Sequence, residues 1–254
     1  MKNFNLYEKL IRADILASTN DFAIDLVKSD EPVEGTVIMA DFQTKGKGQK
    51  DAHWISKKDS NLTFSVLLYP SFLDPANNFY LSMALSLGIV DMLQFYNIDA
   101  RIKWPNDIYT KNGKIAGILI ENGIQNDEIK YSVLGIGLNV NQKIFPEDIK
   151  NPTSMRIELE TVNNRETVLK KLLVSVEYWF NKLYDLNLNM IKNQYEQKLL
   201  FREQIKKFYA GDDIFFGTIK GINDNGQLLI ADESDTIRAF NFKEVMYYHK
   251  KNII

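Results

Sequence analysis

The segment at 100–121 constrains the fold of this chain more than any other. It reads Ala-Arg-Ile-Lys-Trp-Pro-Asn-Asp-Ile-Tyr-Thr-Lys-Asn-Gly-Lys, followed by the apolar run Ile-Ala-Gly-Ile-Leu-Ile-Glu. Asn112-Gly113 between two apolar runs is a strong signal of a tight hairpin turn. Pro105 has no N–H for a neighbouring strand, so a plain central strand is disfavoured there. We therefore expect a strand ending near 102, a polar turn at the rim of a sheet, and a hairpin.

The polar turn gathers several kinds of functional group. Lys103 provides a cation, Trp104 an indole and Pro105 a rigid ring with no backbone N–H. Asn106 provides an amide and Asp107 a carboxylate. At the rim of a sheet these groups suit a ligand site, although an ordinary turn would use the same residue types. Lys114 follows the hairpin turn on a strand that pairs back toward Lys103. The two ammonium groups would repel each other unless an anion lies between them.

Composition limits the available chemistry. The 254 residues are 45% hydrophobic and 25% charged, as in soluble globular proteins, and suffice for one large domain or one domain with a small appendage. The net charge of −2 does not indicate a general affinity for nucleic acids or membrane surfaces. The absence of cysteine excludes disulfides and thiolate sites, and His53 and His249 alone disfavour a multi-histidine metal site.

No stretch of the chain is typical of a signal peptide or a membrane span. Residues 1–8 are polar, and no window approaches about 20 uninterrupted apolar residues. We therefore expect a soluble protein, located in the cytoplasm if its source is bacterial.

Hydrophobic periodicity predicts strands and helices throughout the chain. Strands are predicted at 35–40, 61–69, 115–121 and 131–141. Helices are predicted from 18 onward and at 77–96, 165–186 and 189–200. From about 210, short strands at 213–219, 227–231 and 236–242 with tight turns indicate a small β-barrel. We therefore expect an α/β (α+β) fold, with a main domain at 1–208 and a barrel at 209–254.

Two further polar segments are candidates for ligand binding. Ser18-Thr19-Asn20 starts a helix, so its hydroxyls and N–H groups serve as caps or grip a small polar ligand. Residues 44–50 form a glycine-punctuated basic loop that could bring N–H groups and ammonium charges to an anion. A solvated loop, or a nucleic-acid contact shared with Lys57 and Lys58, explains the same pattern. Glycines in the strand at 131–141 permit close approach of a ligand or tight packing.

Taken together, these motifs resemble the biotin protein ligase family, also called biotin–acetyl-CoA-carboxylase ligases. The resemblance covers nearly the whole chain, in the family's order and approximate spacing: residues 18–20, 43–49, 54, 103–107, 113–121 and 135–139. Lys-Trp-Pro-Asn-Asp followed by Lys-x-Ala-Gly-Ile-Leu is the most specific part. The resemblance implies a class II synthetase-like mixed sheet flanked by helices and a small C-terminal SH3-like barrel. It also implies the short form of the family, without an N-terminal DNA-binding domain.

The activity implied by the resemblance has two steps. Biotin's carboxylate attacks the α-phosphate of ATP to give biotinyl-5′-AMP and pyrophosphate, and a lysine of a biotin carrier protein then attacks this anhydride. The first step needs cations and Mg²⁺ to bring two anions together, and no nucleophilic side chain. We expect Lys103 and Asp107 to serve opposite ends of the reaction, held apart by Trp104 and Pro105. Asp107 would orient the acceptor lysine or take its proton.

Site residues follow from the same resemblance, position by position. The catalytic residues would be Lys103, Asp107, Lys114 and Lys47. Biotin would be bound by Ser18, Thr19, Asn20, Gln43, Gly46, Lys47, Lys114 and Gly117. ATP would be bound by Lys47, Gly48, Gln49, Trp54, Lys103, Asn106 and Asn139. No residue is predicted to bind a metal directly. The expected partner is a biotin carrier protein, with no DNA or membrane, and the expected state is a monomer or homodimer.

The basic loop departs from the family pattern, in which a second arginine and a further glycine are common. Gln49 lacks the charge of the common arginine. Asp51 replaces the glycine and would bring a negative charge near the phosphate, and Ala52 is also unusual for the family. Two alternatives to biotin ligation remain open. One is a lipoate or octanoate ligase with the same adenylation chemistry, and the other is a non-catalytic binding module that uses the basic loop.

Overall fold

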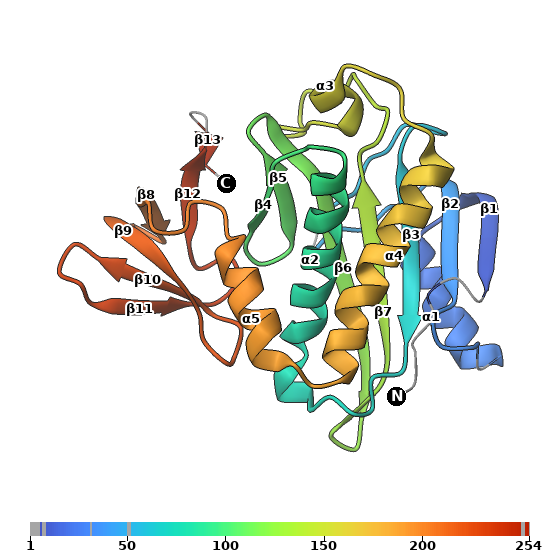
Figure 1. The fold of residues 1–254 in the computed structure, drawn as a ribbon, viewed down its shortest axis with the longest axis horizontal. Coiled ribbons are helices and arrows are strands. Elements are labelled where there is room, and N and C mark those ends of the chain that lie inside the picture. Colours follow the sequence, from blue (N-terminus) through green and yellow to red (C-terminus); the bar gives the residue numbers. More distant parts are fainter. Residues whose placement is uncertain (1–5, 7–8, 31, 50–51, 250–251, 254) are drawn as a thin grey trace.

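Apolar strands between amphipathic helices produce a body built on a large sheet, with a smaller sheet beside it (Figure 1). The computed structural model describes residues 1–254 except 1–5, 7–8, 31, 50–51, 250–251 and 254. In the main body the strands are β1 (Leu10–Leu16), β2 (Val37–Gln43), β3 (Leu62–Leu68), β4 (Ala100–Lys103), β5 (Asp107–Thr110), β6 (Gly113–Gln125) and β7 (Glu128–Leu138). The helices are α1 (Thr19–Asp30), the short 3-10 turn η1 (Pro75–Asn77), α2 (Phe79–Phe95), α3 (Met155–Leu159), α4 (Arg165–Tyr184) and α5 (Leu188–Gln197).

The large sheet of the described residues has the strand order β1-β2-β3-β7-β6-β5-β4. β1 pairs with β2 in parallel and the other neighbours are antiparallel, so the sheet is mixed. The predicted hairpin is confirmed, but its turn residues are Lys111 and Asn112 rather than Asn112 and Gly113, since Thr110 pairs with Gly113. β4 is an edge strand, which agrees with the position of Pro105 two residues after its end.

Helices cover both faces of this sheet. α2 and α4 pack against each other and cover one face, with α5 beside α2 (Figure 1). α1 covers the opposite face, where Ala23 packs with Ile38, Leu67 and Val133. Adjacent residues of the same strands, such as Val37 and Leu134, belong to the larger core under α2 and α4. This alternation explains why β3 is buried along its whole length.

The C-terminal region forms a second sheet. Its strands in the described residues are β8 (Ile205–Ala210), β9 (Asp213–Ile222), β10 (Leu228–Asp232), β11 (Ile237–Phe240), β12 (Met246–His249) and β13 (Asn252–Ile253), in the order β11-β10-β9-β8-β12-β13. All of these pairs are antiparallel. The predicted strands at 213–219, 227–231 and 236–242 correspond to β9, β10 and β11. β8 begins before the expected start of this region, at Ile205.

The polar turn at 103–107 joins the two sheets and the helix layer. Trp104 Nε1 donates a hydrogen bond to Gly226 O at 2.9 Å, across 122 residues of sequence. Pro105 O accepts hydrogen bonds from Ser82 Oγ of α2 (3.3 Å) and Tyr195 OH of α5 (3.4 Å). The second sheet, α2 and α5 therefore all contact this turn, which fixes its position relative to them.

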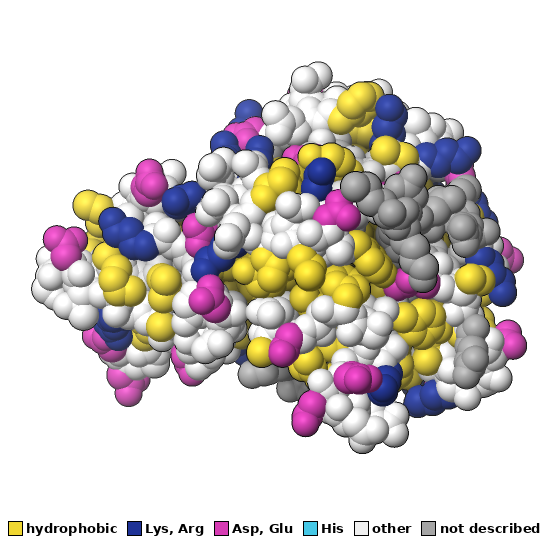
Figure 2. Space-filling view, turned by 60° about the horizontal axis from the view of Figure 1, so that its bottom comes forward, with side chains coloured by type: hydrophobic (Ala, Val, Ile, Leu, Met, Phe, Trp, Pro, Cys, Tyr) yellow, Lys and Arg dark blue, Asp and Glu magenta, His cyan; other side chains and the backbone are white. Residues whose placement is uncertain are grey.

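The surface shows mixed charge. In Figure 2, hydrophobic side chains gather in a band across the middle of the visible face, and acidic and basic side chains are interspersed around it. Within the described residues, no helix combines the length and the apolar character that a membrane crossing requires.

Replacing Trp104 with Phe should loosen the C-terminal sheet. Phenylalanine keeps an aromatic ring at this buried position but fills less space than the indole, and Gly226 O loses its donor, so we expect a loss of at least about 1–2 kcal/mol in the free energy of unfolding. Guanidinium unfolding followed by circular dichroism measures it. Tyr178→Phe on the exposed face of α4 is the control, with an expected change within about 0.5 kcal/mol. Equal stabilities for the two variants would contradict the proposed role of the Trp104 bond.

Candidate active site

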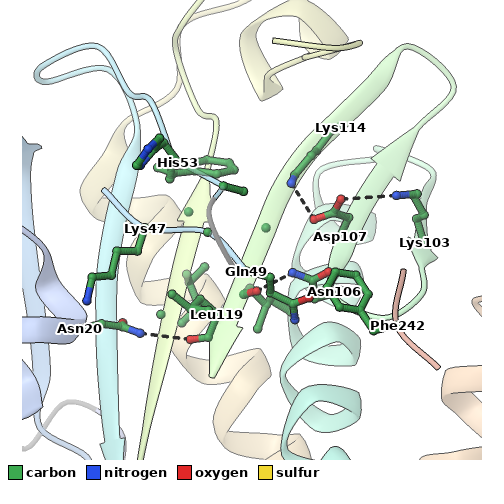
Figure 3. Close-up of a pocket in the computed structure, with 18 of the residues that line it drawn as sticks. Asn20, Lys47, Gln49, His53, Lys103, Asn106, Asp107, Lys114, Leu119 and Phe242 are labelled. Carbon is green, nitrogen blue, oxygen red and sulfur yellow. Dashed lines mark hydrogen bonds and ion pairs between the residues drawn. The ribbon is translucent and has the colours of Figure 1, made fainter. Parts of the chain in front are cut away.

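A cavity of about 310 Å³ lies at the rim of the large sheet, beside the second sheet (Figure 3). Its wall combines the start of α1, the loop after β2, the turn at 103–107, the first half of β6, the end of β7, and part of the C-terminal region. The predicted residues that line it are Ser18, Thr19, Asn20, Gln43, Lys47, Gly48, Gln49, Trp54, Lys103, Asn106, Asp107, Lys114 and Gly117. Segments distant in sequence therefore meet in one cavity, as the motif pattern predicted.

The start of α1 supplies one end of the cavity. Ser18 Oγ accepts a hydrogen bond from Asp21 N at 3.4 Å, which is the expected capping contact. Thr19 N donates to Gln43 Oε1 at 2.7 Å. Ser18, Thr19 and Asn20 are each only 3% exposed, and all three line the cavity. Ser18 therefore serves both helix capping and cavity lining.

Two residues that the sequence analysis did not select lie behind these side chains. Ser65, buried in the middle of β3, has its Oγ 2.7 Å from Thr19 Oγ1 and 2.6 Å from Asn20 Oδ1. Glu121 Oε2 on β6 accepts a hydrogen bond of 2.7 Å from Asn20 Nδ2. The available signal for Ser65 was a hydroxyl inside an otherwise apolar strand. Local sequence does not reveal that Glu121 reaches α1.

The glycine-rich basic loop folds as a narrow hairpin rather than an open loop. Gly48 N donates to Ala52 O at 2.7 Å, and Trp54 N donates to Gly46 O at 3.0 Å. A Cβ at Gly46 would lie 2.3 Å from Trp54 O, which explains the glycine there. The hairpin delivers Trp54 into the cavity. Asp51 lies outside the described residues, so its expected effect stays a prediction.

Two facing glycines of the sheet accommodate the Trp54 indole. Gly117 of β6 pairs with Gly137 of β7. A Cβ at Gly137 would lie 2.2 Å from Trp54 Cε2, and one at Gly117 would lie 3.2 Å from Cζ3. Lys114 Nζ is 5.7 Å from the centroid of the ring. Close approach by a side chain, not tight sheet-to-helix packing, therefore accounts for the glycines at these two positions.

At the other end of the cavity, Asp107 lies between two lysines (Figure 3). Its Oδ1 is 2.6 Å from Lys114 Nζ, and its Oδ2 is 3.8 Å from Lys103 Nζ. Burial lowers the pKa of Lys103 below its ordinary value, and the charge of Asp107 opposes that shift. The predicted convergence of the two lysines is confirmed. The expectation that Lys103 and Asp107 stand apart was wrong, because β4 and β5 pair these two residues directly.

Lys47 lies on the opposite side of the cavity from this cluster (Figure 3). Its ammonium group forms an ion pair with Asp21 of α1, and this hydrogen bond raises the pKa of Lys47. The side chain is 44% exposed. Lys47 therefore lies near the predicted biotin-binding residues and away from Lys103 and Lys114.

The remaining predicted residues differ in how they meet the cavity. Asn106 lines it, but its Nδ2 donates to Ile118 O at 2.8 Å and so also ties the turn to β6. Gln49 Oε1 is buried with no hydrogen-bond partner among the described residues. Gly46 and Asn139 are not part of the wall. Asn139 Nδ2 donates to Thr153 O at 3.0 Å, and its Oδ1 is buried without a hydrogen-bond partner among the described residues, so its expected contact with a nucleotide stays a prediction.

The C-terminal region contributes wall residues that the sequence analysis did not name. They are Phe242, Lys243, Val245, Met246 and Tyr247. No local pattern marks them individually, because their place in the wall depends on how the second sheet docks.

Comparison with known proteins assigns the family. Residues 13–139 match the model of the biotin/lipoate A/B protein ligase family, and this range includes most of the cavity wall. The chain belongs to this family. It is 30% identical over 229 residues to the bifunctional ligase/repressor BirA of Bacillus subtilis, covering 88% of this chain and 69% of that protein. It is 25% identical to the biotin–[acetyl-CoA-carboxylase] ligase of Mycobacterium tuberculosis, covering 85% and 82% of the two chains.

Solved structures of family members share the fold. The biotin protein ligase of Aquifex aeolicus in complex with biotin and ATP superposes with a TM-score of 0.79 at 28% identity. The match covers 96% of this chain and all of that one. The predicted fold class, a mixed sheet flanked by helices with a small C-terminal SH3-like barrel, is confirmed, and the described C-terminal strands form an antiparallel sheet.

In this family member, Gly137→Ala should displace the Trp54 ring, because the new Cβ would overlap the indole. We expect a shift in tryptophan emission and a loss of about 1–3 kcal/mol in the free energy of unfolding. Fluorescence spectra and guanidinium unfolding measure both. In a Trp54→Ala background the same substitution should have a much smaller effect on stability. Equal costs in the two backgrounds would show that the ring is not what Gly137 accommodates.

Proposed function

We propose that this chain is an ATP-dependent biotin protein ligase. It activates biotin as biotinyl-5′-AMP and transfers the biotinyl group to a lysine of a biotin carrier protein, such as that of acetyl-CoA carboxylase. The observation that carries the proposal is the cavity itself. One end presents buried hydrogen-bonding groups, and the other presents two lysines around one carboxylate. The relatives named for biotin ligation, and the related structure holding biotin and ATP, support this assignment.

The polar end of the cavity suits the cyclic urea of biotin. Gln43 Oε1 already accepts from Thr19 N, which leaves Gln43 Nε2 to donate to a ligand carbonyl. The hydroxyls of Ser18 and Thr19 provide acceptors for ligand N–H groups. A ring that offers both a carbonyl and N–H groups satisfies this wall. The dithiolane ring of lipoate offers neither and would leave these buried groups unpaired, which argues against the lipoate ligase alternative.

The charged end suits the first chemical step. Biotin's carboxylate attacks the α-phosphorus of ATP, a new C–O–P link forms, and the bond to pyrophosphate breaks. Lys103 and Lys114 offset the repulsion between the carboxylate and the triphosphate and stabilise the charge that builds up on the phosphoryl oxygens. Trp54 Nε1 and Gln49 Oε1 are buried without partners among the described residues, and we propose that they contact the nucleotide.

The second step needs only an amine and a leaving group. The acceptor lysine of the carrier attacks the carbonyl of the anhydride, and AMP departs with the bonding electrons. We propose that Asp107 first arranges Lys103 and Lys114, and then orients the incoming amine or takes its proton. Lys47, paired with Asp21, would close the biotin end. No covalent intermediate with the protein is required, which is consistent with a chain that has no cysteine.

Mg²⁺ would enter with ATP. The described residues contain no group of three or more His, Asp or Glu side chains that could hold a metal ion. Mg²⁺ commonly binds through substrate phosphates, water and one or two carboxylates, so the triphosphate would be its main ligand. Its chemistry here would be to offset phosphate charge. We propose that the reaction takes place in the cytoplasm, where ATP is available.

Pyrophosphate exchange into ATP tests the proposed activity. We expect exchange that depends on biotin and does not occur with lipoate. Lys114→Ala should lower it about 100-fold or more, because one of the two cations that face the substrates is lost. Lys111→Ala is the matched control, since Lys111 is an exposed lysine in the same hairpin turn. Exchange supported by lipoate, or none with either acid, would contradict the proposal.

The pH dependence of the exchange should report on Lys103. Because burial lowers the pKa of Lys103, it loses its charge at a lower pH than the ordinary 10.5 of a lysine, and the rate should fall on that alkaline side. Nearby Tyr109 has a raised pKa and titrates later. Lys103→Arg should move the alkaline fall to higher pH, because arginine stays charged. An identical alkaline limb in both proteins would exclude Lys103 as the titrating group.

A further inference from the structure

A line of hydrogen bonds runs from the polar end of the cavity to Glu121. Thr19 Oγ1 lies 2.7 Å from Ser65 Oγ, which lies 2.6 Å from Asn20 Oδ1. Asn20 Nδ2 donates to Glu121 Oε2 at 2.7 Å and to Leu119 O at 3.3 Å. Ser65 is fully buried, and Thr19 and Asn20 are 3% exposed. The cavity therefore connects to a carboxylate through side chains that water barely reaches.

The proton positions in this line follow from the carboxylate. A carboxylate oxygen only accepts, so the group that Asn20 turns toward Glu121 must be its NH₂, and its Oδ1 must face Ser65. Oδ1 cannot donate, so the single proton of Ser65 is used for that bond. The contact between Ser65 and Thr19 then requires the proton of Thr19. Thr19 consequently has no proton left for a ligand and can only accept.

Packing holds the amide of Asn20 in place. A Cβ at Gly135 would lie 2.4 Å from Asn20 Oδ1, so the strand fits directly against this amide. The backbone acceptor at Leu119 reinforces the orientation, but its bond is longer than the bond to the charged acceptor Glu121. The bond from Asn20 to Glu121 is therefore the stronger of the two bonds that fix the donor and acceptor directions along these hydrogen bonds.

We propose that Glu121 is a positioning residue for substrate selection. Acting through Asn20 and Ser65, it keeps Thr19 as an obligate acceptor, so that the cavity selects a ligand ring with an N–H at that point. This inference rests on the proposed function, because it deepens the recognition of the biotin ureido ring. Glu121 itself need not touch the ligand.

Binding of two biotin derivatives by calorimetry tests the inference. The probes are biotin methylated on either ureido nitrogen, which lacks one N–H, and desthiobiotin, which keeps the ureido group. The native chain should discriminate strongly against one of the N-methyl derivatives. Glu121→Leu and Ser65→Ala should each weaken biotin binding about 10-fold and reduce that discrimination about 10-fold, because Thr19 regains a proton it can donate. The ratio of biotin to desthiobiotin affinity should stay unchanged.

Two variants separate positioning from general damage. Glu121→Gln keeps an acceptor for Asn20, so it should retain most of the discrimination. Glu128→Leu removes an exposed carboxylate from the β6–β7 hairpin and should change nothing. Equal weakening of biotin and its N-methyl derivatives by both Glu121→Leu and Ser65→Ala would overturn the inference, as would no change at all. If Glu121→Leu does not fold, Ser65→Ala decides. Absence of any biotin binding by the native chain would instead refute the proposed function.

Discussion

The cavity depends on one carboxylate held between two ammonium groups. The ammonium groups of Lys103 and Lys114 repel each other when they lie close together. The carboxylate of Asp107 offsets this repulsion because it forms an ion pair with each of them. The sheet sets this arrangement: β4 and β5 pair Lys103 with Asp107, and the irregular register after Ile108 brings β6 and Lys114 alongside. The hairpin at the edge of the sheet therefore places two cations at one end of the cavity. The burial that this requires lowers the pKa of Lys103.

The two ends of the cavity use different physics for different tasks. At the α1 end, hydrogen bonds among buried side chains, anchored by the carboxylate of Glu121, fix which atoms can donate and which can accept, so this end is suited to selection. At the Asp107 end, charge dominates and direction matters less, so this end is suited to anions whose charge moves during a reaction. Trp54, seated on two glycines, lies between them and next to Lys114.

Local sequence was sufficient for much of the fold and for part of the site. The hairpin around Asn112-Gly113 and the helical stripe of α4 are properties of short segments, so they were predictable. β1 was missed because it is an edge strand interrupted by Arg12 and Asp14, and its partner lies beyond a helix. The site residues found by motif mostly line one cavity, whereas Ser65 and Glu121 were missed because their roles arise only from contacts between distant strands and α1.

The Trp104–Gly226 bond links ligand binding to the docking of the second sheet. Separation of that sheet would remove one side of the cavity while leaving the large sheet intact, and such partial opening needs less free energy than complete unfolding. A ligand that touches both sides binds only the docked form, so each increment of its affinity also holds the two sheets together. The protection of the C-terminal strands from hydrogen exchange therefore depends on the ligand as well as on the protein, and it rises when the cavity is occupied.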